Sequence, residues 1–70
     1  MDPTATYKIL LEWLDKYRDG ASYNISMKEC DEAREAAHSL IRWLQKGGFP
    51  PEGRIKHEAI AVCRYVLRVG

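Results

Sequence analysis

The sequence predicts an all-α protein, a small antiparallel bundle of three helices. Apolar residues recur at helical spacing in three segments, and joints rich in Gly and Pro separate these segments. The chain has 70 residues, which is enough for one small domain. We therefore expect a single domain over residues 1–70, with helices at about 3–18, 27–46 and 53–67, and the short joints place neighbouring helices antiparallel.

The first helix has a clear start and a clear stop. Asp2 is a suitable N-cap, Pro3 suits the first helical position, and Gly20 is the expected left-handed cap at the end. One face of this segment carries Tyr7, Leu10, Leu11, Leu14 and Tyr17. Ile9 and Trp13 are expected at the edges of this apolar face.

The second helix shows a capping box, because Ser26 is followed three residues later by Glu29. Acidic residues gather near its start and basic residues near its end, as the helix dipole favours. Its apolar face is predicted to hold Cys30, Ala33, Ala37, Leu40, Ile41 and Leu44. Gly47-Gly48 and Pro50-Pro51 end the helix.

The third helix is expected to begin near Gly53 and to end at about Leu67. Its predicted core face consists of Ile55, Ala59, Val62, Cys63 and Val66. The valines lower helix propensity, so a strand over residues 60–69 is the competing interpretation. A single strand would have no partner in this chain, which favours the helix.

The end of the second helix carries the most distinctive local sequence. Residues 43–51 read WLQKGGFPP and follow an alanine-rich amphipathic stretch that begins at Asp31. This run of about 21 residues resembles a family of short uncharacterised bacterial and phage-type helical proteins that share a WLxKGGFPP-like turn. The resemblance implies a helical fold and supplies no activity.

Composition narrows the classes of function. Eleven Lys and Arg against ten Asp and Glu leave a net charge of +1, which excludes a generic polyanion binder. No apolar run approaches the roughly 18 residues of a membrane span, and the first residues lack the pattern of a secretory signal. We expect a cytoplasmic protein without a membrane partner, in which Cys30 and Cys63 are free thiols.

The sequence offers little for catalysis. His38 and His57 stand alone, and no spacing typical of metal ligands is present. Cys63 lies on a predicted core face, where a packed thiol is the common outcome. We expect no catalytic residue, no metal site and no cofactor.

Three aromatic residues are the candidate contacts with a partner protein: Trp13, Trp43 and Phe49. Large aromatic side chains at the edge of a thin bundle often mark contact surfaces. Phe49 is expected to fold back towards Trp43, or else to project as an exposed docking knob. The leading hypothesis is a non-catalytic interaction module that pairs with itself as a homodimer or binds another protein.

Weak nucleic-acid binding is the alternative. On a helical wheel, a basic stripe on the third helix combines Arg54, His57, Arg64 and Arg68. These side chains could contact phosphates. A solvated helix face is the more common meaning of such a pattern.

Overall fold

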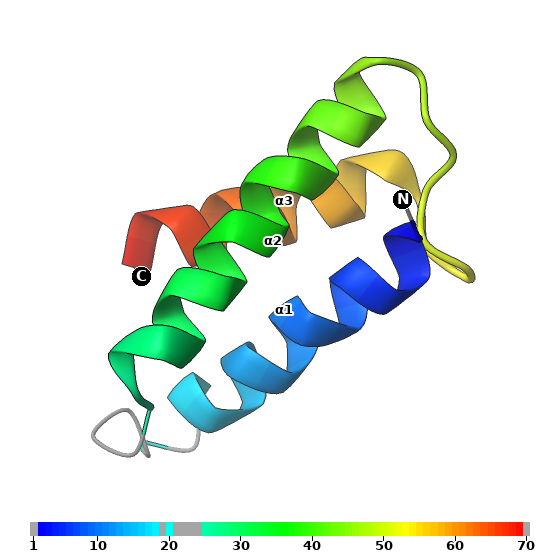
Figure 1. Ribbon diagram of the computed structural model, residues 1–70. Helices are drawn as coiled ribbons and strands as arrows, with labels where there is room; N and C mark the ends of the chain where they lie inside the picture. The colour runs from blue at the N-terminus through cyan, green and yellow to red at the C-terminus, as the bar shows by residue number, and fades with distance from the viewer. Residues whose placement is uncertain (1, 19, 21–24, 70) are drawn as a thin grey trace.

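Three α-helices form the protein (Figure 1). The computed structural model describes residues 2–18, 20 and 25–69, and within these residues it contains α1 (Pro3–Arg18), α2 (Met27–Gln45) and α3 (Lys56–Val69) and no strand. α1 and α2 run antiparallel, and α3 packs on one side of this pair, more extensively against α2 than against α1. The predicted all-α three-helix bundle is confirmed.

Side-chain caps fix the starts of the first two helices. Asp2 Oδ1 accepts hydrogen bonds from the backbone N–H groups of Thr4 (3.1 Å) and Ala5 (3.2 Å). Ser26 has extended backbone angles and its hydroxyl accepts from the N–H of Glu29 at 3.1 Å. Both predicted N-caps are therefore confirmed, which explains why α1 and α2 begin where the sequence indicates.

Gly47 ends α2. It adopts a φ of 94°, and its N–H donates to the carbonyl of Leu44 at 3.1 Å. The segment that follows returns to the start of α1, where the N–H of Glu52 donates to Thr4 Oγ1 at 2.9 Å and Pro51 is fully buried. The α2–α3 connection thus closes one end of the bundle.

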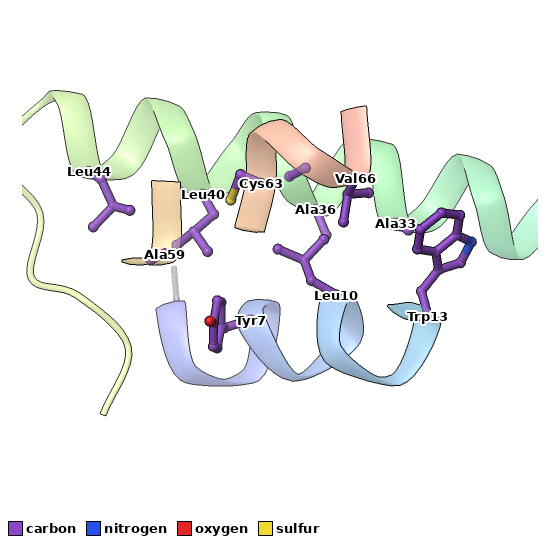
Figure 2. Close-up of a cluster of buried hydrophobic side chains, with 11 residues drawn as sticks. Tyr7, Leu10, Trp13, Ala33, Ala36, Leu40, Leu44, Ala59, Cys63 and Val66 are labelled. Atoms are coloured by element: carbon purple, nitrogen blue, oxygen red, sulfur yellow. The ribbon is translucent and has the colours of Figure 1, made fainter. Parts of the chain in front are cut away.

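Small side chains on α2 face large side chains on α1 in the core (Figure 2). α1 contributes Tyr7, Leu10 and Trp13. The buried residues of the other two helices are Ala33, Ala36, Ala37, Leu40, Leu44, Ala59, Cys63 and Val66. The alanines allow α1 and α2 to approach closely while leaving room for the aromatic rings.

The position of Trp13 corrects the sequence prediction. It is 5% exposed and belongs to the core, whereas Leu11 and Leu14 are only half-buried. Its indole stacks on Tyr17 with ring centroids 5.3 Å apart. Figure 2 shows the ring standing between α1 and α2, opposite the alanines of α2, so the buried face of α1 is turned towards Trp13.

The start of α3 also differs from the prediction. The helix begins at Lys56 rather than near Gly53, because Gly53 has a φ of 73° and Arg54 N–H donates to the carbonyl of Pro51 in a turn. Ile55 precedes the first helical turn and is 65% exposed, so it is not a core residue. At its other end α3 reaches Val69, slightly beyond the expected end.

Candidate protein-interaction site

Trp43, Gly48 and Phe49 form an aromatic knob at the end of α2. The indole Nε1–H of Trp43 donates to the backbone carbonyl of Phe49 at 2.9 Å, and the two rings meet edge to face with centroids 5.4 Å apart. Phe49 nevertheless remains 63% exposed. The turn therefore combines the two alternatives predicted from the sequence. Phe49 folds back onto Trp43, and its side chain still projects into solvent.

A groove runs between α1 and α2 on the side that α3 does not cover. It consists of two adjoining hollows of about 150 and 600 Å³ that share Ile9 and Glu32. α1 lines this α1/α2 groove with Asp2, Thr6, Ile9, Glu12, Trp13 and Lys16. α2 lines it with Glu29, Glu32, Glu35, Ala36 and Ser39.

Carboxylates dominate the electrostatics of the α1/α2 groove. Its lining contains five acidic residues and one base, Lys16. Lys16 Nζ lies 2.7 Å from Glu29 Oε2 and links the two helices. Among the described residues the other four acids form no ion pair, so the groove presents a negative surface.

Trp13 lines this groove, and its indole nitrogen is buried. Within the described part of the chain it has no hydrogen-bond partner. Figure 2 shows it on the edge of the ring away from Leu10 and Val66. An unpaired buried donor costs about 1–3 kcal/mol.

The predicted basic stripe is only partly assembled. His57, Arg64 and Arg68 share the exposed face of α3 that points away from the core. Arg54 does not belong to it, because it precedes the helix. Its guanidinium instead lies 3.0 Å from Glu58 Oε1 and 5.7 Å from the centroid of the Tyr7 ring.

The two thiols differ in their surroundings. Both cysteines are free; Cys30 is half-buried and Cys63 is fully buried. Burial raises the pKa of the Cys63 thiol to about 11. A thiol that stays protonated is a poor nucleophile, so Cys63 acts in the structure as a small apolar side chain. Burial likewise raises the pKa of the Tyr7 hydroxyl above its ordinary value.

Two further features bear on function within residues 2–18, 20 and 25–69. No group of three His, Cys, Asp or Glu side chains gathers there in a way that could hold a metal ion. None of the helices combines the length and the apolar character that crossing a membrane requires.

Comparison with known proteins adds no relative. No family model, no curated protein and no solved structure matches the chain. The resemblance of residues 31–51 to short bacterial and phage-type proteins therefore stays a prediction.

Sequence reasoning identified the aromatic knob and most of the basic stripe but missed the α1/α2 groove. A signal for it existed, since Glu29, Glu32 and Glu35 recur every three residues along one side of α2. This spacing indicates a groove only together with the structure, in which α3 leaves this side of α2 uncovered.

Proposed function

We propose that this protein is a non-catalytic interaction module that associates with a second copy of itself through the uncovered face of α1 and α2. The observation that carries the proposal is the aromatic knob, in which Phe49 is 63% exposed yet held in place. Exposed Phe, Trp and Tyr side chains are typical anchors of protein interfaces.

The knob is preorganised for binding. The hydrogen bond from Trp43 fixes the carbonyl of Phe49, and the link from Glu52 to Thr4 anchors the chain that follows. Little conformational entropy would be lost when such a side chain enters an interface. A rigid exposed Phe therefore supports a binding role better than a flexible one would.

The knob and the α1/α2 groove form one face. Glu32, Ala36 and Trp43 are spaced by four and seven residues, which places them on the same side of α2. The knob thus lies at one end of the groove. A net charge of +1 creates little repulsion between copies, which supports a second copy as the partner.

We place this association in the cytoplasm. Two free thiols, one of them only half-buried, are typical of a reducing compartment. Labelling of the thiols in cells of the native host would test this assignment, and their recovery as a disulfide would contradict it.

Sedimentation equilibrium tests the proposed function. Wild-type protein should show a mass above 8.1 kDa at high micromolar concentration. Phe49→Ala should weaken the association by at least about tenfold, as expected for an interface anchor. Met27→Ala is the matched control, because Met27 is 82% exposed at the other end of α2. A wild-type mass that stays at 8.1 kDa would refute self-association.

Weak nucleic-acid binding remains the second candidate, favoured by the shared exposed face of His57, Arg64 and Arg68. Fluorescence anisotropy with a labelled single-stranded oligonucleotide would test it. Phosphate contacts predict an affinity that falls steeply with salt, with a slope set by the number of basic contacts. Arg64→Glu/Arg68→Glu should abolish such binding, and no binding at low salt would exclude the function.

A further inference from the structure

We infer that the basic outer face of α3 in one copy docks on the acidic α1/α2 groove of the next copy. This inference rests on the proposed self-association and names its two contact surfaces. It gives a role to two features that the aromatic knob alone leaves unexplained, the negative groove and the basic face on the opposite side of the same molecule.

The two surfaces carry opposite charge. The groove has five acids and one base, and only Glu29 of these acids is ion-paired among the described residues. The outer face of α3 carries Arg64 and Arg68 together with His57. Glu58 is the acid within α3, and it is held by Arg54 beside Tyr7. Complementary charge of this kind sets the register of an interface and speeds association.

The dimensions also agree. α3 has 14 residues and is therefore about 21 Å long at the helical rise of about 1.5 Å per residue. The groove follows α1 from Asp2 to Lys16, which is also about 21 Å. Ala61 lies among the basic residues of α3 and is exposed, so its small side chain permits close approach of the helix.

The indole of Trp13 provides a probe of the groove, because Trp13 is one of its lining residues. The side chain is 5% exposed, and its Nε1–H is buried without a hydrogen-bond partner among the described residues. Docking therefore changes the surroundings of this N–H, and the indole resonance of Trp13 reports on it.

The arrangement has a consequence for symmetry. α3 and the groove lie on opposite sides of the α1–α2 pair, as Figure 1 shows with α3 behind that pair. A contact between unlike surfaces is heterologous, so copies join head to tail. This arrangement differs from the two-fold homodimer that the sequence suggested, and it predicts species larger than a dimer at high concentration.

A charge-swap experiment tests the inference. Glu32→Lys/Glu35→Lys reverses the groove, and Arg64→Glu/Arg68→Glu reverses α3. In either variant alone, like charges face each other, and association should weaken by at least about tenfold. An equimolar mixture should restore association, because each surface then meets its complement. Asp15→Lys/Asp31→Lys is the matched control, since both residues are exposed and outside the groove.

The outcomes separate the two proposals. If the wild type associates but neither charge variant weakens it, or if the mixture stays dissociated, the docking of α3 on the groove is wrong and self-association stands. If the wild type remains at 8.1 kDa, both proposals fail. In a dilution series of the wild type, an indole ¹H–¹⁵N resonance of Trp13 that does not move would also overturn the groove contact.

Discussion

Gly48 lies against the indole of Trp43 so closely that a Cβ atom added to it would be 2.5 Å from Nε1 and 2.6 Å from Cδ2. The backbone of Gly48 does not need a left-handed conformation, since the positive φ values belong to Gly20, Gly47 and Gly53. Gly48 is thus required for space. Its missing side chain is what allows Trp43 to reach the carbonyl of Phe49.

Gly48→Ala should therefore destabilise the protein by about 1–3 kcal/mol, the usual cost of overpacking. That corresponds to a fall in Tm of roughly 4–8 °C for each kcal/mol in a domain of this size. Thermal unfolding followed by circular dichroism measures it. Gln45→Ala is the control, because Gln45 is exposed at the same end of α2. An unchanged Tm for Gly48→Ala would contradict the packing of Trp43.

Leu44 tests the core near the same end of the molecule. It is fully buried on α2, one residue from Trp43 and directly before the closing turn. Leu44→Ala should lower the free energy of unfolding by about 2–5 kcal/mol through lost burial and the cavity left behind. Urea denaturation provides the measurement. Replacement of the exposed Met27 by Ala should change the midpoint little, and an equally small effect at Leu44 would place that face outside the core.

Local signals explain how much of the fold could be predicted from the sequence. α1 and α2 were located well because Asp2 and Ser26 cap them with short-range hydrogen bonds that the sequence itself encodes. α3 has no such cap, and the turn through Gly53 displaced its start. Ile55 and Arg54 were misassigned for that reason.

Contacts between helices explain the remaining errors. The burial of Trp13 depends on the alanines of α2, which leave space that a helical wheel of α1 alone does not reveal. The α1/α2 groove could not be predicted for a related reason. It lies on the side of the α1–α2 pair that α3 does not cover, and the sequence does not show which side α3 covers. The sequence shows the charge pattern along each helix. It does not show which charged side chains of one helix lie opposite those of another.

Cys63 gives the protein a distinctive alkaline pH dependence. Burial raises its pKa from 9.0 to about 11, so between these values the folded protein keeps a proton that the unfolded chain loses. The stabilising contribution is complete below pH 9 and is lost as pH rises towards 11. The slope of this contribution approaches about 1.4 kcal/mol per pH unit.

Urea denaturation at several pH values should show that Cys63→Ala loses this part of the slope. The comparison of wild type with variant removes the contribution of other groups that titrate in the same range, Tyr7 included. Equal slopes for the two proteins would indicate that the thiol is hydrated in the folded state. Cys63→Ala also lowers stability at neutral pH by creating a cavity, but that offset does not depend on pH.

The start of α1 is held by the side chain of Asp2, which accepts from Thr4 and Ala5. Thr4 in turn accepts from Glu52, so the same turn of helix anchors the α2–α3 connection. Asp2→Ala should cost about 0.5–2 kcal/mol, because two N–H groups lose their acceptor. Asp2→Asn keeps an acceptor oxygen and should cost little. Urea denaturation of the three proteins compares them directly, and hydrogen exchange at Glu52 should quicken in Asp2→Ala alone. If Asn is as damaging as Ala, the negative charge acting on the helix dipole stabilises this end, and the hydrogen bonds do not.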